Sequence, residues 1–574
     1  MNYSLHISKT KYGNYYAYRH NYRESGKVKT KDIYLGPEEI AVKIISDFTS
    51  KKPLNERHLS FSGELILSRM LELVGFRALI NKLVQNRAKF DVGRFIELLV
   101  VERSIYEYSK WSLANVGHEK SILSLDSIIT CDKFYENNIY HYMDYIYPHL
   151  DQIQREIVKK LLAMKEIDFE ELIIDATSIH CFGSDEIEEP KNRIEKYVEV
   201  NRTHGYSRSK RPDLPQINLI LGVTNHNIPL LFDAFSGNAP DPTMFKLILE
   251  KCKREYTPLL KKVKEKYIVF DKGNNSEDNF KDLDALCEAW ECHFVASVRP
   301  SLVGVKKQLE SLRIEELPVI HEQKCTKLRG KTIALILYEA ERNVLLYVNE
   351  EIAKKEQEDF LNVLNEIQEN VEEINQKNDI IENKLSAAKE LLQKKRLVSY
   401  FKSVVENGTI KCSPIEKKVN RKLNSRGKFA IITNDFSLDA VSIIRIYKTA
   451  GVVEREFHIL KSVLSLYPLN HRKKERIKVH CALVIWGAMA YALLRSLLLS
   501  HAMEFTFEEL KEKIKQGYVS IGDYVYPGYK SFRIQRILNL NPVLQAIFEL
   551  FTLDSDYFDI TLLPTVEEKN NEKI

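Results

Sequence analysis

The chain has 574 residues, a length that exceeds one hydrophobic core and predicts roughly three or four domains. Hydrophobic residues make up 44% and charged residues 29%, which is typical of a folded protein and excludes an intrinsically disordered one. The formal charge is only +5, so the total charge does not indicate a nucleic-acid partner. Two segments are locally basic: residues 417–428 carry six cations and no acid, and residues 472–478 carry five cations and one acid. Such segments contact phosphates in some proteins and only aid solubility in others.

The first 165 residues are expected to form two units. Residues 1–45 alternate tyrosines with polar side chains and break at glycines, which predicts a small β-rich N-terminal piece. Its aromatic and cationic side chains fit a nucleic-acid surface, and they fit the wet face of a hairpin equally well. Residues 57–165 show helical periodicity, which predicts an all-α domain of several short helices. We hypothesise that this unit is a helical DNA-binding domain with a helix-turn-helix. The pattern does not identify which of its helices would read DNA.

The pattern changes to apolar strands over residues 170–300. The expected order is β-β-β-α-β-α-β, which gives a mixed sheet with helices on its faces. Asp175 lies at the centre of the first strand, and Asp271 ends the fourth. A buried aspartate is costly unless it is paired or binds a metal ion. Two such aspartates in one sheet fit Mg²⁺ or Mn²⁺, the ions that serve phosphoryl transfer.

Residues 301–434 are expected to interrupt this sheet with an insertion domain of β-strands and one long helix, 351–398. That helix holds an unbroken four-three apolar spacing, with Asn378 as a polar core position. The apolar seam would pair with a partner chain or pack against its own domain. The strand Phe429–Asp435 then returns the chain to the core.

Residues 435–500 are expected to complete the core. Read as one helix, the stretch 447–461 places Tyr447, Glu454 and Lys461 at seven-residue steps on one face. A carboxylate between a phenol and a cation suits holding a metal ion against a phosphodiester, although a solvated helix face has the same composition. Residues 501–574 are expected to form a C-terminal helical region and a polar tail.

Cysteines and apolar runs bear on the cellular compartment. The eight cysteines are scattered without a Cys-x-x-Cys pair, which fits a reducing cytoplasm. Cys287, Cys292 and His293 form the nearest group, which we interpret as buried thiols beside a strand rather than a zinc site. The polar N-terminus predicts no signal peptide. The apolar run Cys481–Leu494 is too short to cross a bilayer, so we expect a core helix and no membrane partner.

These residues resemble the DDE transposases of bacterial insertion sequences. Asp175, Asp271 and Glu454 match the three carboxylates of that family. Tyr447, Glu454 and Lys461 match the Tyr-x2-Arg-x3-Glu-x6-Lys signature of its cut-and-paste branch, whose arginine falls on Ala450 here. The similarity runs from about residue 170 to 495, and similar stretches are Asp213–Gln216, Gly237–Asn238, Asp271–Gly273, Leu466–His471 and, near the N-terminus, Tyr34–Gly36.

The resemblance implies a multidomain α+β protein with a ribonuclease H-like mixed α/β catalytic core. It implies a DNA transposase that binds the terminal inverted repeats of its element, cleaves the ends and joins them to target DNA by two-metal phosphoryl transfer. The expected cofactor is a pair of Mg²⁺ ions, with Mn²⁺ able to substitute, and the expected catalytic metal ligands are Asp175, Asp271 and Glu454. The residues expected to contact DNA are Tyr447, Lys461, His471 and Arg472.

The expected partner is double-stranded DNA, at the element ends and at the target, bound by a homodimer in the bacterial cytoplasm at the nucleoid. Ala450 replaces the signature arginine. The resemblance therefore implies a hairpin intermediate in DNA cleavage only if Arg445 or Arg455 takes the place of that arginine. The same departure leaves a second hypothesis, a catalytically inactive or co-opted sequence-specific DNA-binding protein derived from a transposase. A third is a structural coiled-coil protein whose basic segments only aid solubility; its DNA affinity would not fall steeply with salt.

Overall fold

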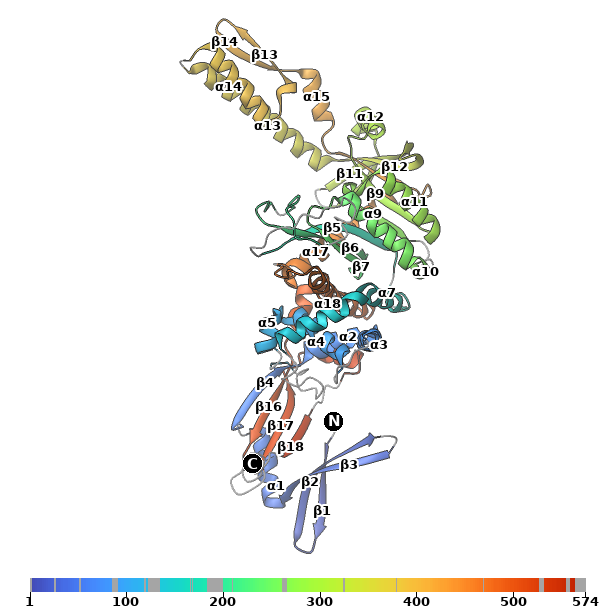
Figure 1. Ribbon diagram of the computed structural model, residues 1–574, viewed down its shortest axis with the longest axis vertical. Coiled ribbons are helices and arrows are strands. Elements are labelled where there is room, and N and C mark those ends of the chain that lie inside the picture. The colour runs from blue at the N-terminus through green and yellow to red at the C-terminus, as the bar shows by residue number, and fades with distance from the viewer. Residues whose placement is uncertain are drawn as a thin grey trace.

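The structure is a computed structural model of the chain. It describes residues 3–24, 27–50, 53–84, 91–117, 120–121, 135–165, 167, 169–182, 200–208, 210–260, 266–323, 326–377, 379–467, 469–525, 531–553 and 558–562. The molecule is elongated, with a small sheet at one end, helices in the middle, a large sheet beyond them and an arm at the other end (Figure 1).

A nine-stranded mixed sheet forms the centre of the fold. Its strand order is β10-β11-β12-β15-β9-β8-β5-β6-β7; β8 pairs parallel with β5 and with β9, and the other neighbouring strands pair antiparallel. Every residue of β5 except Asp175 is buried, which requires both faces of the sheet to be covered. The strands are β5 (Glu171–His180), β6 (Gln216–Thr224), β7 (Pro229–Ser236), β8 (Tyr267–Phe270), β9 (His293–Val298), β10 (Val319–Gln323), β11 (Thr326–Leu337), β12 (Ala340–Asn349) and β15 (Lys428–Thr433).

The mixed sheet expected from the sequence is confirmed. The helices that pack on it include α9 (Asp241–Lys251) beside β6, α16 (Ala440–Lys448) beside β9 and β15, and α17 (Gly451–His458) beside β5, while α11 (Glu277–Trp290) packs on α9. Strands β10 to β12 lie within this sheet, whereas the sequence pattern assigns them to a separate insertion. The reason is that β12 pairs antiparallel with β15, a neighbour about 80 residues away that local periodicity does not reveal.

The arm contains two helices where one long helix over 351–398 was expected, and that expectation is wrong. Helices α13 (Glu350–Gln376) and α14 (Ile381–Lys394) pack on each other and on the hairpin β13 (Phe401–Glu406) and β14 (Thr409–Pro414). Apolar seam residues from both helices are buried in one small core, so the seam packs within its own arm. A four-three spacing does not distinguish a straight helix from one that turns back. Asn378 lies outside the described residues.

Helix α18 (Lys474–Ser500) runs through the middle of the molecule. It contacts α2 (Ser62–Leu73), α4 (Val92–Tyr106), α6 (Glu136–Ile146) and strand β7. Its length and hydropathy, 1.8 over the most apolar window, would suffice for a membrane span, but 89% of that window is buried inside the protein. The same buried core includes the short helices α3 (Phe76–Leu83) and α7 (Leu150–Leu161) and the central sheet.

The C-terminal region is not purely helical, and the expectation for residues 501–574 is wrong in this respect. Besides α19 (Phe507–Ile514) and α20 (Pro542–Leu550), it contains β16 (Tyr518–Tyr524), β17 (Phe532–Leu538) and β18 (Phe558–Leu562). These strands form a sheet with β4 (Asn55–Ser60), so segments more than 450 residues apart pair directly. The expected polar tail lies outside the described residues.

The first 50 residues form a separate small sheet. Strands β1 (Tyr3–Thr10), β2 (Gly13–Glu24) and β3 (Lys27–Pro37) pair antiparallel, and α1 (Glu38–Ser50) packs on β2 and β3. Strand β18, the last described element of the chain, lies toward this end of the molecule as well (Figure 1).

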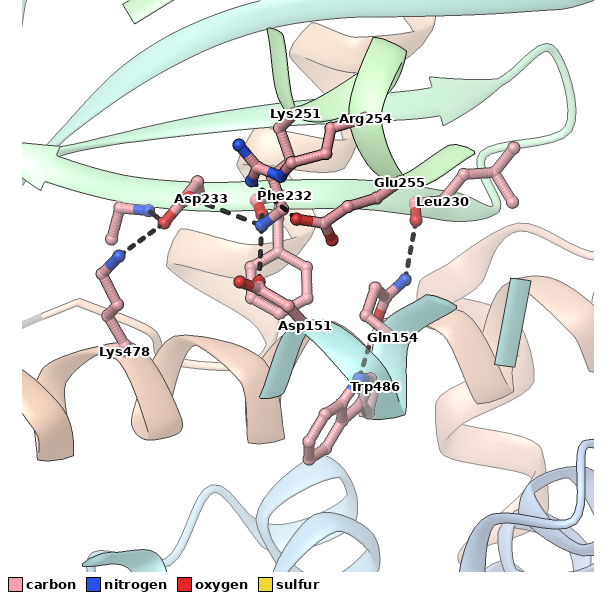
Figure 2. A network of polar contacts seen from close by, with 11 residues as sticks. Asp151, Gln154, Leu230, Phe232, Asp233, Lys251, Arg254, Glu255, Lys478 and Trp486 are labelled. Atoms are coloured by element: carbon pink, nitrogen blue, oxygen red, sulfur yellow. Dashed lines mark hydrogen bonds and ion pairs between the residues drawn. The ribbon is translucent and has the colours of Figure 1, made fainter. Parts of the chain in front are cut away.

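A buried polar network joins the helices to the edge strand of the central sheet (Figure 2). The Gln154 amide donates to the Leu230 carbonyl at 2.8 Å and accepts from the Trp486 indole N–H at 2.8 Å, which ties α7 to β7 and α18. Nearby, Asp233 accepts from Lys478 at 2.9 Å and Lys251 at 3.4 Å. The network fixes how the central sheet sits on α18.

Replacing Gln154 with leucine should destabilise this junction. Leucine has a similar volume, but it leaves the Leu230 carbonyl and the Trp486 N–H buried without partners, at a cost of about 1–3 kcal/mol for each group. Thermal unfolding monitored by tryptophan fluorescence should show a lower Tm for Gln154→Leu. The exposed neighbour Gln152→Leu is the control and should melt like the wild type. Equal melting of both variants would contradict the role of this network.

Candidate active site

Parallel pairing of β5 with β8 brings two aspartates side by side. In the register, Ile174 lies opposite Phe270, so the next residues, Asp175 and Asp271, are neighbours across adjacent strands. Adjacent strands lie about 4.8 Å apart, which allows two carboxylates at matching positions to act on one ligand. Both side chains line a cavity of about 500 Å³, here called the carboxylate cavity.

The Asp271 carboxylate is held from the next parallel strand. The Ser297 hydroxyl of β9 donates to Oδ1 of Asp271 and accepts from the Lys272 amide at 2.8 Å. The Tyr447 hydroxyl lies 3.3 Å from the same Oδ1. Burial raises the pKa of Tyr447, so its hydroxyl stays protonated and can donate. Two donors therefore meet one oxygen of Asp271.

Asp175 lies in a more enclosed setting. Burial raises its pKa to about 6, and the nearby carboxylates of Asp271 and Asp241 add to the effect, while the Ala176 amide and Arg208 oppose it. Arg208 pairs with Asp241 at 2.5 Å and donates to the Ser178 hydroxyl at 3.2 Å. A smaller cavity of about 330 Å³ is lined by Asp175, Asp271, Arg208 and Asp241. The arrangement concentrates negative charge around a single arginine.

The stretch 447–461 is not the single helix that the sequence predicts. Helix α16 ends at Lys448, α17 begins at Gly451, and a π-helical turn, Ile459–Val463, follows. The break occurs where the Val452 amide bonds back only three residues, to Thr449, whose hydroxyl caps the Ile446 carbonyl. The prediction of one helix over 447–461, with Tyr447, Glu454 and Lys461 on one face, is therefore wrong.

The signature positions nevertheless gather around the aspartates. Glu454 lines both the carboxylate cavity and the smaller one, and Ala450 lines the carboxylate cavity. The Lys461 ammonium donates to the Thr177 hydroxyl at 2.5 Å, two residues beyond Asp175. Burial, with Arg208 nearby, lowers the pKa of Lys461 to about 8. Tertiary structure, rather than one helix face, brings these side chains together.

The site supplies some, but not all, of the oxygen ligands that a hard divalent cation needs. Two adjacent aspartates supply oxygen ligands, and a cation between them would relieve the repulsion that helps to raise the pKa of Asp175. In the part of the chain that the structure describes, no group of three His, Cys, Asp or Glu side chains is arranged to hold a metal ion. Glu454 is exposed on the cavity wall and would have to approach the aspartates to become a third ligand.

The other two residues expected to contact DNA lie outside both cavities. The His471 ring packs against the rings of Tyr140 and His480, and burial, with cations including Lys110 nearby, lowers its pKa to about 3. Its neighbour Arg472 is exposed. Neither side chain lines the carboxylate cavity, so their contact with DNA stays a prediction.

Three residues of the site were not singled out from the sequence. Ser297 is an ordinary strand residue. The only feature of the sequence that could have identified it is its place in β9, the strand that pairs with β8, which ends just before Asp271. Arg208 lies in the loop before β6, and Asp241 begins α9 directly after Pro240. Their proximity to Asp175 depends on how β5, β6 and β8 assemble.

Replacing Ser297 with alanine should free the Asp271 carboxylate to rotate. If Asp271 binds a metal ion, loss of such an orienting hydrogen bond should lower metal affinity or DNA cleavage by about 10–100-fold. Titration of Mn²⁺ binding measures the first and cleavage of labelled DNA the second. Ser311→Ala, an exposed serine at the end of a helix, is the control. Unchanged binding and cleavage in Ser297→Ala would show that Asp271 is oriented by other contacts.

The comparisons with known proteins give a matching family model and a structural likeness. The family model described as Transposase DDE domain matches residues 168–493, more than half of the chain. A solved piggyBac transposase synaptic complex with hairpin DNA is similar, with 11% sequence identity and a TM-score of 0.37, and the match covers 80% of this chain and 82% of that chain. No curated protein sequence matches.

Proposed function

Because the chain belongs to the Transposase DDE domain family, we propose that it is a DNA transposase that binds the terminal inverted repeats of its own element, cleaves the ends and joins them to target DNA. The proposed chemistry is metal-dependent phosphoryl transfer on a ribonuclease H-like core, carried out by a homodimer on double-stranded DNA in the bacterial cytoplasm. The observation that carries this proposal is the pairing of Asp175 with Asp271 in one cavity inside the segment that the family model matches.

The proposed roles follow from the contacts of each side chain. Asp175 and Asp271 are the metal ligands, with Glu454 as the third carboxylate. Ser297 and Tyr447 hold Oδ1 of Asp271, which leaves its other oxygen directed to the ligand. Lys461 binds a phosphate oxygen at the reacting position; its ammonium already donates to the hydroxyl of Thr177, close to Asp175. Two bound Mg²⁺ or Mn²⁺ ions would supply activation of water or of a 3′-hydroxyl and stabilise the leaving oxygen.

Strand cleavage tests this function directly. A labelled duplex carrying the DNA that flanks the gene is incubated with the full chain and Mg²⁺, with Mn²⁺, or with EDTA. Metal-dependent cutting at the element ends, followed by joining to a second duplex, would support the proposal. Sequence-specific binding without any cutting, in either metal, would overturn the enzymatic part.

A second candidate is a catalytically inactive or co-opted DNA-binding protein derived from a transposase. Two observations favour it. Ala450, at the position of the signature arginine, lines the carboxylate cavity with only a methyl group. Glu454 does not complete a three-carboxylate cluster among the described residues. The same cleavage assay separates the two candidates, because this one predicts tight binding to the element ends and no metal-dependent product.

A further inference from the structure

A second hollow, here called the basic groove, lies at the base of the arm. Its volume is about 590 Å³, and it is bounded by α12 (Val303–Ser311), the start of α13, the turn before β13, and α15 (Glu416–Asn424). Six cations and two carboxylates line it, which leaves a net charge of four positives. The cations are Lys306, Lys418, Arg421, Lys422, Arg426 and Lys428, and the carboxylates are Glu310 and Glu356.

The cations come from a helix face and from facing elements. On α15, Arg421 and Lys422 lie three and four residues after Lys418, so the three side chains share one side of the helix. Lys306 approaches from α12 on the other side. The folded chain thus collects into one concave surface a basic segment that would otherwise be an ordinary solvated helix face.

Only part of this charge is neutralised within the protein. Arg421 forms a two-pronged pair with Glu310 at 2.7–2.8 Å, and Arg426 lies 3.8 Å from Glu356. Lys418 donates to the Ser399 carbonyl, which orients its charge without cancelling it. Among the described residues, the side chains of Lys306 and Lys422 make no hydrogen bond or ion pair, so their ammonium groups are available to an anionic ligand.

The basic groove adjoins the carboxylate cavity. Pro300 and Phe429 line both hollows. A polyanion whose phosphate sits at Asp175 and Asp271 can therefore continue past these two residues into the groove. Successive phosphates along a nucleic-acid strand can contact several of the cations in the groove at once, whereas one small anion would contact only a few of them.

We propose that the basic groove binds the phosphate backbone of the DNA whose reacting phosphate occupies the carboxylate cavity, with Lys306 and Lys422 as direct phosphate contacts. This inference rests on the proposed function for the identity of the polyanion. It assigns to the root of the arm a binding role separate from the chemistry, so binding and cleavage can be tested apart.

The test is the salt dependence of DNA binding by the full chain carrying Lys306→Gln and Lys422→Gln. Affinity for a labelled duplex is measured by fluorescence anisotropy between about 50 and 200 mM salt. Each lost phosphate contact lowers the slope of log affinity against log salt by about 0.9, so the double variant should lose roughly 1–2 from the slope. Lys306→Arg with Lys422→Arg keeps both charges and should retain the wild-type slope.

A matched control removes two charges elsewhere on the same arm. Lys354→Gln with Lys389→Gln changes exposed lysines that line neither cavity and should leave the slope unchanged. The proposed role of the basic groove in DNA binding is excluded if the Lys306/Lys422 variant keeps the wild-type slope. It is also excluded if the control variant loses as much of the slope as the Lys306/Lys422 variant does. Neither result depends on cleavage: a chain that binds DNA through the groove without cutting would fail the proposed function alone.

Discussion

Asp271→Asn should reduce metal-dependent DNA cleavage at least about 10³-fold while leaving DNA binding largely intact. Asparagine keeps the shape of the side chain and can still accept the hydrogen bonds from Ser297 and Tyr447. It removes the negative charge beside Asp175, and a bound metal ion contributes several kcal/mol to the reaction, with each 1.4 kcal/mol worth about tenfold in rate. The measurement is initial cleavage rate on end-labelled duplex at saturating Mg²⁺.

The control for this prediction is Asp278→Asn. Asp278 is an exposed residue of α11 that pairs loosely with Lys246 at 3.7 Å and lies outside the cavities. Its variant should cut at the wild-type rate. If Asp271→Asn also cuts normally, the pair of aspartates does not carry the chemistry and the proposed mechanism is wrong. Mn²⁺ titration of both variants adds a readout that is independent of turnover.

Glu102→Gln should stabilise the protein at pH 8 and have little effect at pH 4.5. Glu102 is fully buried on α4, close to the buried Glu64 of α2. Burial raises the pKa of Glu102 from 4.5 to about 7, and the Ser121 side chain offsets only part of this shift. Burial and the neighbouring Glu102 also raise the pKa of Glu64. Two carboxyls close together in an apolar core cannot both ionise cheaply.

The direction of the pH effect follows from linkage. The folded state holds the Glu102 proton more tightly than the unfolded state, so the associated stability is complete below about pH 4.5 and is lost as pH rises through 7. A pKa that rises from 4.5 to about 7 corresponds to about 3 kcal/mol. Glutamine imitates the protonated form and avoids this loss. The advantage of the variant should therefore appear between pH 5 and 8.

Thermal melts of the full chain at pH 4.5 and pH 8 measure this effect. One kcal/mol changes Tm by roughly 2–4 °C in a domain of 150–250 residues. Glu102→Gln should thus melt several degrees above the wild type at pH 8. Glu250→Gln removes an exposed carboxylate of α9 and should track the wild type at both pH values. A Tm difference that does not depend on pH would show that Glu102 carries no such linkage.

The two aspartates of the candidate site were readable from the sequence because each marks a local transition. One aspartate lies inside an apolar strand and the other at a strand end, and both stand out because burying a carboxylate costs free energy. The spacing of Tyr447, Glu454 and Lys461 is a local feature as well. Ser297, Arg208 and Asp241 were not visible in this way. Ordinary residue types acquire a role only when the strand order β9-β8-β5-β6 places them beside Asp175 and Asp271.

By itself, the sequence determined the mixed sheet, the buried helix around residues 481–494 and the pair of aspartates, since apolar periodicity and the cost of burying a charge act over a few residues. Tertiary structure alone decided that β12 joins β15, that β16 pairs with β4, and that the helix expected over 351–398 turns back on itself. These outcomes depend on contacts between segments far apart in the chain. A strand or an apolar seam has the same pattern whichever partner finally covers it.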